Sequence, residues 1–324
     1  MDHLGRADAE RRRGFSCGLH RRYRVRCGLP RDGPGTGPPG VPAGAVGSAL
    51  RVGSAVRSDV VRPTHRRHLG IGNATPPRGR GSRSRHTDAV SPERHVLITG
   101  ATGSLGRVAA AAFAADGARL GLIGTDGARL QGLARDLRLD DDRWAAGVGD
   151  LRDADACLAA VGAVVERLGP VDVLLHLVGG WTGGTALTDL QPSVLDEMLG
   201  QHVWSTFHVA RAIVPAMQAR GFGRIVAVTS SYAAAPGPRM AAYVAAKAAQ
   251  ETILRVLARE VAGQGVTVNL IAVKTIDAKH ERETDPSPRN ASWTTPEEIV
   301  ATMRYLCSDE AAAVNGQRIP LDGR

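Results

Sequence analysis

The feature that most constrains the fold is a regular alternation of short apolar runs with longer helical patterns, from about residue 94 to the C-terminus. Residues 171–178 and 223–229 are almost continuously apolar, as expected for strands buried on both faces of a parallel sheet. Strands that alternate with helices of this length form βαβ units with right-handed crossovers. The sequence therefore predicts an α/β fold with a Rossmann-type, doubly wound parallel sheet in three layers.

We expect this fold to occupy one domain at residues 91–324. Strands are expected at 95–99, 119–123, 144–148, 171–178, 223–229, 266–272 and 318–320. Helices are expected at 105–115, 128–137, 153–168, 193–219, 241–262 and 296–307.

Residues 1–90 differ in composition, because they are rich in Arg, Gly and Pro and lack periodicity. Such a segment buries too little apolar surface to offset chain entropy, so a disordered leader is expected. Residues 1–94 contain 19 Arg, no Lys and 7 acidic residues, a net charge of +12, whereas the remainder carries −3. A basic tail that contacts nucleic acid or anionic surfaces, an organelle-targeting peptide and a start site assigned too far upstream all fit. We favour the last, or plain disorder, over nucleic-acid contact.

The rest of the composition argues against several other classes of protein. The four cysteines, Cys17, Cys27, Cys157 and Cys307, form no C-x-x-C pair and no metal-ligand spacing, which predicts free thiols and no metal site. No apolar run approaches a membrane span, and no apolar core with a small-residue cleavage site marks a secretory signal. We therefore expect a cytoplasmic protein without membrane contact.

The first predicted strand leads into a glycine-rich turn, T-G-A-T-G-S-L-G, which opens the first predicted helix. Glycines there permit a tight turn and let backbone N–H groups approach a pyrophosphate, which the helix N-terminus also favours. Such a turn is weak evidence alone, but within a full βαβ series it indicates a dinucleotide site. We expect cofactor contacts from Gly100, Thr102, Gly103, Ser104, Leu105 and Gly106.

A second stretch, residues 229–247, contains three residues that together form a catalytic set. Tyr243 and Lys247 lie four apart in an alanine-rich run, which places both side chains on one helix face. Tyrosine has a pKa near ~10, and a lysine ammonium one turn away favours the phenolate and lowers that pKa. Ser230, at the end of an apolar run, is placed to hydrogen-bond a substrate oxygen beside the tyrosine hydroxyl. An exposed Tyr and Lys on an ordinary helix is the alternative for this pattern taken alone.

These motifs, in this order, resemble the short-chain dehydrogenase/reductase family from about residue 94 to the C-terminus. The resemblance implies hydride transfer between NAD(P)(H) and a carbonyl or alcohol. It implies that Ser230 orients the substrate oxygen, that Tyr243 donates its proton, and that Lys247 holds the nicotinamide ribose. The turn departs from the commonest family pattern, T-G-x-x-x-G-x-G, because Ser104 replaces the middle glycine; its spacing is that of the extended members.

The resemblance also bears on the choice of cofactor. NAD-specific relatives place an acidic residue near Gly124, and NADP-specific relatives often place Arg at Thr125; this chain has neither. The absence of a negative charge at Gly124 and the hydrogen-bond donor of Thr125 favour NADP. Asp126, one residue further on, is compatible with NAD. Asp150 matches the position that contacts adenine in relatives, with a solvated loop carboxylate as the alternative for both aspartates.

Two positions near the expected site depart from the family pattern. Relatives carry N-N-A-G after the fourth strand, where this chain has H-L-V-G and keeps only the glycine, Gly179, that allows close approach to the cofactor. Trp181 follows between glycine pairs, and it either stacks on a planar substrate or caps the core. Many relatives add an Asn to the catalytic set, five residues ahead of a Phe. Counting back from Phe207 gives His202 at that position. His202 is either a substitute for the Asn in a water-linked proton relay or a structural residue.

Several stretches, V-G-G-W-T-G-G, V-K-T-I-D and S-W-T-T-P-E-E, are similar to dihydropteridine reductases, although those enzymes commonly lack the serine present at Ser230. This similarity is to a branch of the family and not to an activity. Trp181 between its glycine pairs and the short loop after Val273 favour a compact planar or cyclic substrate, such as a pterin-like or quinone-like ring, and a 3-oxoacyl thioester is the alternative. A non-catalytic dinucleotide-binding regulator is an alternative from another class. Relatives pair the helix at 241–262 between subunits, so a homodimer or homotetramer is expected.

Overall fold

The computed structural model describes residues 93–321, so the predicted disorder of the leader lies outside the described residues. Seven parallel strands form one sheet in the order β3-β2-β1-β4-β5-β6-β7. The strands are β1 (His95–Thr99), β2 (Arg119–Gly124), β3 (Trp144–Val148), β4 (Val173–His176), β5 (Gly223–Ser230), β6 (Val266–Val273) and β7 (Arg318–Pro320). This confirms the predicted Rossmann-type sheet, and the direction of winding reverses between β1 and β4, where such folds bind ligands.

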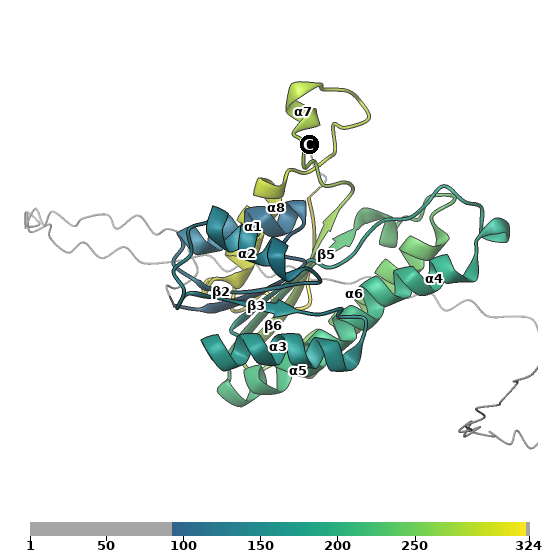
Figure 1. The fold of residues 1–324 in the computed structure, drawn as a ribbon. Helices are drawn as coiled ribbons and strands as arrows, with labels where there is room; N and C mark the ends of the chain where they lie inside the picture. Colours follow the sequence, from purple (N-terminus) through teal and green to yellow (C-terminus); the bar gives the residue numbers. More distant parts are fainter. Residues whose placement is uncertain (1–92, 322–324) are drawn as a thin grey trace, which may run out of the picture. The chain divides into compact units, whose positions relative to one another are not determined.

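The principal helices cover both faces of the sheet and complete three layers (Figure 1). On one face lie α1 (Ser104–Ala115), α2 (Gly127–Asp136) and α8 (Pro296–Cys307). On the other lie α3 (Ala154–Leu168), α5 (Ser205–Arg220) and α6 (Ala241–Glu260). The short helices are α4 (Pro192–Leu199) and α7 (Glu281–Thr284), together with the short segments η1 (Leu187–Asp189), η2 (Gly200–Trp204) and η3 (Ser231–Ala233).

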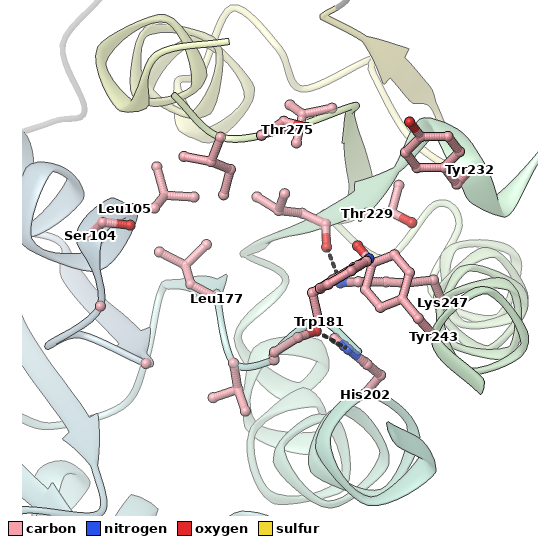
Figure 2. A pocket seen from close by; sticks show the side chains of 18 of the residues that line it. Ser104, Leu105, Leu177, Trp181, His202, Thr229, Tyr232, Tyr243, Lys247 and Thr275 are labelled. Carbon is pink, nitrogen blue, oxygen red and sulfur yellow. Dashed lines mark hydrogen bonds between the residues drawn. The ribbon is translucent and has the colours of Figure 1, made fainter. Parts of the chain in front are cut away.

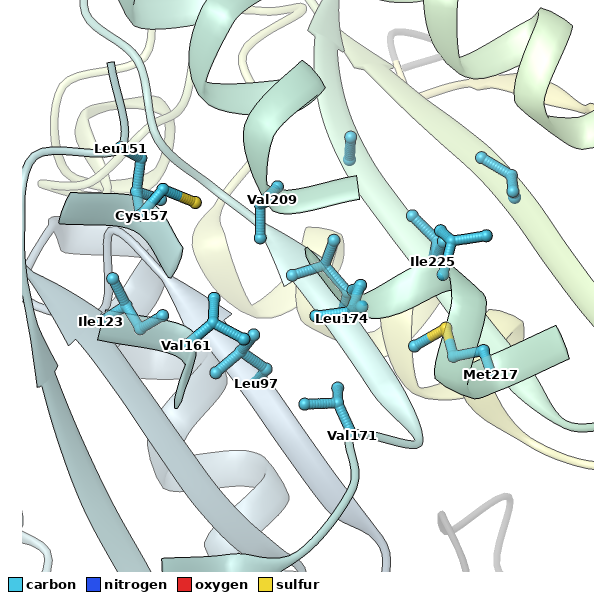
Figure 3. Packing of buried hydrophobic residues seen from close by; sticks show 14 of the residues in the cluster. Leu97, Ile123, Leu151, Cys157, Val161, Val171, Leu174, Val209, Met217 and Ile225 are labelled. Atoms are coloured by element: carbon cyan, nitrogen blue, oxygen red, sulfur yellow. The ribbon is translucent and has the colours of Figure 1, made fainter. Parts of the chain in front are cut away.

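A dry apolar core lies between the sheet and its second helical layer. Leu97 and Leu174 project from neighbouring strands toward Val161 of α3 and Met217 of α5, and all four are buried (Figure 3). Fully burying one such side chain contributes roughly 1.5–3 kcal/mol to the free energy of unfolding. This packing makes the sheet a rigid support, so the loops that leave its strand ends have fixed starting points.

Local sequence signals set several helix starts. Asp126 and Asp153 cap α2 and α3 by accepting hydrogen bonds from backbone N–H groups of their first turns. Thr295 begins α8 with a capping box to Glu298, and Pro296 occupies the first turn. These caps explain why the predicted and observed boundaries of the three helices differ by no more than one residue.

The predicted helix at 193–219 is instead a composite of α4, a π-helical segment and α5. The π-helical segment, η2, widens one turn by a residue and directs His202 into the protein, where it is 1% exposed. Hydrophobic periodicity does not reveal such a turn, because the helical pattern continues on both sides of it.

Two further predictions concern the cysteines and membrane-spanning helices. Cys157 and Cys307 are free and buried, as predicted, and burial raises their pKa values to about 11 and about 12. Cys17 and Cys27 lie outside the described residues. Within residues 93–321, none of the helices combines the length and apolarity needed to cross a bilayer.

Candidate active site

A cavity of about 610 Å³ opens at the carboxyl edge of the sheet. In Figure 2, Ser104 and Leu105 lie on one side of it, and His202, Tyr243 and Lys247 lie on the other. Ten of the predicted site residues line it, namely Gly100, Gly103, Ser104, Leu105, Gly106, Gly179, Trp181, His202, Tyr243 and Lys247. Thr102, Thr125, Asp150 and Ser230 do not appear among the lining residues, and Ser230 is buried directly behind them.

The glycine-rich turn is fixed by contacts that side chains would prevent. Gly100 has φ +69°, and a Cβ there would approach the Leu177 carbonyl oxygen to 2.9 Å. A Cβ on Gly106 would collide with the Gly100 carbonyl oxygen. The turn therefore packs against itself and against the loop after β4, and only glycine fits at either position.

The N-terminus of α1 opens onto the cavity. Its N-cap is Gly103, with no side-chain cap, and no acidic residue occupies the first turn among the described residues. The first-turn N–H groups of a helix lack intrahelical partners and carry partial positive charge. This turn is therefore suited to a phosphate or pyrophosphate.

The three predicted catalytic residues come together from two elements. Ser230 ends β5, is 2% exposed, and its Oγ accepts a hydrogen bond from the Tyr232 backbone N–H at 3.2 Å. Tyr243, on the first turn of α6, shares a side-chain hydrogen bond with Ser230. Lys247, one turn later, lines the same cavity. Strand β5 and helix α6 are separated by a short connection, which is why thirteen residues suffice to bring the pair together.

The expected lowering of the Tyr243 pKa is not what the structure shows. Burial raises the pKa of Tyr243 above its usual value, and the hydrogen bond with Ser230 offsets this only in part. Lys247 Nζ donates to the Val228 carbonyl oxygen at 2.9 Å and to Gln250 Oε1 at 3.0 Å. Tyr243 is thus held as a neutral phenol, which is the form that donates a proton.

Lys247 is itself strongly perturbed. Its side chain is buried, and this burial lowers its pKa to about 7, although the nearby Glu251 carboxylate acts to raise it. Its amine therefore changes charge close to neutral pH, as is common for functional lysines.

His202 packs against Tyr243, with the ring centroids 5.7 Å apart. Its Nε2 donates to the Gly180 carbonyl oxygen at 3.0 Å, and a Cβ on Gly179 would collide with its ring. Burial lowers the pKa of His202 to about 3, so the ring is neutral at physiological pH. Within the described residues its Nδ1 is buried without a hydrogen-bond partner. This geometry favours the structural role over the proton-relay role, which stays a prediction.

Trp181 stands at the mouth of the cavity and is 64% exposed, so it does not cap the core. Its indole lies over Gly183, where a Cβ would approach Cζ2 to 2.7 Å. The loop is tied to the opposite rim, because the Gly184 N–H donates to the Arg239 carbonyl oxygen at 2.8 Å. An exposed indole supported by glycine is suited to stack on a flat ligand.

The predicted adenosine contacts lie outside this cavity. Thr125 is exposed, and Asp126 accepts from the Arg129 backbone N–H at 3.1 Å as the cap of α2. Asp150 pairs with the Arg152 guanidinium at 2.7 Å, and this hydrogen bonding lowers its pKa. Contact between Asp150 and adenine stays a prediction.

Sequence reasoning missed a set of buried and half-buried polar residues around Lys247 and Ser230. Gln250 and Glu251 follow Lys247 by three and four residues, so helical spacing was a signal that placed them beside it. His176, Thr206 and Arg318 come from distant elements, and no local signal identifies them. Arg318 donates to the Ser230 carbonyl oxygen at 3.0 Å and to Glu251 at 3.1 Å, which braces the end of β5.

Comparison with known proteins agrees with this geometry. A gamma-butyrolactone 1′-reductase of the A-factor type from Streptomyces virginiae is 31% identical over 71% of this chain and 95% of its own length. A 3-oxoacyl-(acyl-carrier-protein) reductase of Mycobacterium bovis is 28% identical over 73% of this chain and 96% of its length. The structure of L-sorbose reductase from Gluconobacter frateurii, complexed with NADPH and L-sorbose, is similar with a TM-score of 0.65 and 25% identity, over 73% of this chain and 98% of that one.

The family model described as short chain dehydrogenase matches residues 94–288, which include the glycine-rich turn, the β5 terminus and the Tyr243–Lys247 helix. That match spans more than half of the chain, and the chain covers nearly the whole length of its relatives. The order of strands, the cavity at their carboxyl ends and the matched family agree, and the chain belongs to the short-chain dehydrogenase family of oxidoreductases.

Proposed function

We propose that this protein is an NADPH-dependent reductase of a compact cyclic carbonyl compound. One observation carries the proposal: Tyr243 and Lys247 line one cavity opposite a helix N-terminus suited to a pyrophosphate, and the buried Ser230 is hydrogen-bonded to Tyr243. Bound in this cavity, the nicotinamide would supply the hydride, and the chain's own residues would position the reactants and supply the proton.

Tyr243 is the proton donor in this proposal. Burial keeps its phenol protonated, so it can transfer its proton to a substrate oxygen as negative charge develops there. Ser230, already hydrogen-bonded to Tyr243, orients that oxygen. Lys247 provides an N–H donor for the nicotinamide ribose. A tyrosine that holds its proton supports the direction of reduction, since oxidation of an alcohol requires the phenolate.

NADPH is favoured over NADH by the end of β2. Asp126, the carboxylate nearest to that end in the sequence, is engaged as the cap of α2. Thr125 is exposed beside it, and Gly124 contributes no charge that would repel a 2′-phosphate. The related L-sorbose reductase structure contains NADPH.

A ring substrate is favoured by Trp181 at the cavity mouth. Its indole is exposed and backed by Gly183, which leaves one of its faces free to stack on a flat or cyclic ligand. A relative whose name specifies a gamma-butyrolactone substrate also points to a ring. The competing substrate is a 3-oxoacyl thioester, as in the name of another relative.

The decisive experiment is NADPH and NADH oxidation against a carbonyl panel. The panel contains quinonoid dihydropterin, small quinones, cyclic ketones and a 3-oxoacyl thioester. Turnover with NADPH and a ring compound, lost in Tyr243→Phe, supports the proposal. Tight NADPH binding without turnover on any compound would instead indicate a dinucleotide-binding regulator.

We further propose that the enzyme is a homodimer or homotetramer. On α5 and the preceding turn, Trp204 and Phe207 are 51% and 38% exposed and form an aromatic cluster with His208. On α6, Val256 is 50% exposed. Apolar groups on these helices support an interface between copies.

A further inference from the structure

Gln250 is a fully buried amide, 0% exposed, that lies one helical turn after Lys247. Both ends of its side chain are hydrogen-bonded. Its Oε1 accepts from Lys247 Nζ at 3.0 Å, and its Nε2 donates to Thr206 Oγ1 at 2.9 Å. An ammonium group only donates, so the orientation of the amide follows from its partner.

The direction of the next hydrogen bonds also follows from donor chemistry. Thr206 Oγ1 lies 2.6 Å from the His202 carbonyl oxygen, which only accepts, so the single hydroxyl proton is directed there. Thr206 must then accept from both Gln250 Nε2 and His176 Nε2, the latter at 3.0 Å. His176 therefore carries its proton on Nε2, and its Nδ1 accepts from Thr99 Oγ1 at 2.9 Å.

These hydrogen bonds form a network, here called the brace, that holds its residues in place and does not transfer protons. From Lys247 it runs through Gln250 and Thr206 to a backbone carbonyl, and the buried ring of His176 joins it as a second donor. An amide does not readily accept a proton on one end and release another, so Gln250 interrupts proton transfer between Lys247 and Thr206. The brace ties α6 to η2, α5, β4 and β1.

We propose that Gln250 is a positioning residue, which holds the Lys247 amine so that its remaining N–H points toward the cofactor side of the cavity. Two of the three ammonium protons are taken, by Gln250 and by the Val228 carbonyl oxygen, and Lys247 lines the cavity. The role in cofactor binding rests on the proposed function, whereas the effect of Gln250 on the amine does not.

The effect of Gln250 on the pKa of Lys247 can be separated from the effects of the titratable groups around the amine. Glu251, on the same helix, is a nearby negative charge, and His176 and His202 are the buried histidines that interact with Lys247 by charge. Gln250 is a neutral acceptor that favours the charged amine. Replacing Gln250 with Leu removes this acceptor, and replacing it with Glu adds a charge, so the two variants act on the amine in opposite directions.

The test is a direct NMR titration of Lys247. The chain contains only three lysines, Lys247, Lys274 and Lys279, so the Lys274→Arg/Lys279→Arg protein labelled with ¹³C-lysine gives a single side-chain signal. In this background we expect Gln250→Leu to lower the pKa of Lys247 by about one unit, and Gln250→Glu to raise it. We expect the Kd for NADPH, measured by fluorescence, to rise roughly tenfold in Gln250→Leu.

Two further variants serve as the second probe and the control. Thr206→Val removes the hydroxyl that anchors Gln250, and it should lower the pKa of Lys247 by less than Gln250→Leu does. Thr252→Val removes an exposed hydroxyl on the same helix that donates to the Ala248 carbonyl oxygen, and it should leave the titration unchanged.

Signals that titrate alike in wild type, Gln250→Leu and Gln250→Glu would overturn the inference, as would shifts of the same sign in both Gln250 variants. If Gln250→Leu fails to fold, an unshifted titration in Thr206→Val overturns it instead. The titration uses neither substrate nor cofactor, so its result is separate from the carbonyl panel that tests the proposed function.

Discussion

The rings of His202 and Tyr243 lie edge to face, with centroids 5.7 Å apart and planes inclined by 77°. His202 comes from the π-helical turn and Tyr243 from the first turn of α6, so this contact sets the spacing between two walls of the cavity. The neutral ring also donates to the Gly180 carbonyl oxygen, which fixes the loop that carries Trp181. His202 is therefore placed to hold Tyr243, the proposed proton donor, rather than to exchange protons with it.

This relationship predicts the outcome of two substitutions at His202. His202→Asn keeps a side-chain donor for Gly180, and we expect kcat to fall by only a few-fold. His202→Leu removes the donor to the Gly180 carbonyl oxygen and so loosens the loop that carries Trp181, and we expect a loss of roughly tenfold or more in kcat/KM. Steady-state kinetics with a solvent isotope comparison checks this. An equal loss in both variants, with a changed isotope effect, would indicate a proton relay through His202.

Removal of the phenol proton should stop the chemistry and leave binding almost intact. We expect Tyr243→Phe to lower kcat by roughly 10²–10⁴-fold, because positioned acid catalysis contributes about that factor. The Kd for NADPH should change little, since the ring and its contact with His202 remain. Lys247→Ala should impair both turnover and NADPH binding. Tyr305→Phe, at an exposed position on α8, is the control.

Buried neutral histidines make the fold sensitive to acid. The pKa of His176 is lowered to about 3, mainly by burial, and its unfolded value is near 6.5. Between these values the unfolded chain binds the extra proton, so stability rises with pH and is lost as pH falls from about 6.5 toward 3. The slope from one such group approaches about 1.4 kcal/mol per pH unit.

Replacing this histidine should therefore flatten the acid side of the stability curve. We expect His176→Asn to be less stable than wild type at pH 7. We expect it to lose less stability than wild type between pH 6.5 and pH 4.5, because this range lies between the unfolded and folded pKa values of His176. Urea unfolding at each pH measures this. His280→Asn, at a partly exposed position, should keep the wild-type slope. An unchanged slope in His176→Asn would show that another group controls acid unfolding.

The Trp181 indole at the cavity mouth should determine the preference for ring substrates over extended ones. We expect ring substrates to have a higher kcat/KM than a 3-oxoacyl thioester, and Trp181→Ala to remove most of that advantage. Aromatic stacking contributes about 0.5–1.5 kcal/mol beyond buried area, or roughly threefold to tenfold. Tyr305→Ala, at an exposed position outside the cavity lining, is the control. A thioester preference that Trp181→Ala leaves unchanged would contradict this role.

Association between copies should depend on the exposed face of α5 and α6. At micromolar concentration, we expect light scattering to give the mass of a dimer or a tetramer. Phe207→Glu places a charge in the exposed aromatic cluster and should shift the protein toward monomer. Leu158→Glu, at a 62% exposed position on α3, should not. A monomeric wild type would contradict the proposed assembly.

The sequence by itself was sufficient to predict the sheet and many of the residues that line the cavity. Apolar runs, helix caps and the glycine-rich turn act over a few residues, and they led to all seven strands and to the loop between β1 and α1. The spacing of Tyr243 and Lys247 on one helix face follows from helical geometry alone, and a serine ending β5 was readily placed beside them.

Only the tertiary structure decided how these residues are tuned. The bonds from Thr206 to His176 and to Gln250 join residues 30 and 44 apart in sequence, so no local pattern encodes them. The pKa of Tyr243 rises instead of falling, because burial of the phenol outweighs its hydrogen bond with Ser230, and burial depends on what packs around the ring. Local spacing determines which side chains share a face, whereas burial and long-range hydrogen bonds determine their charge and direction.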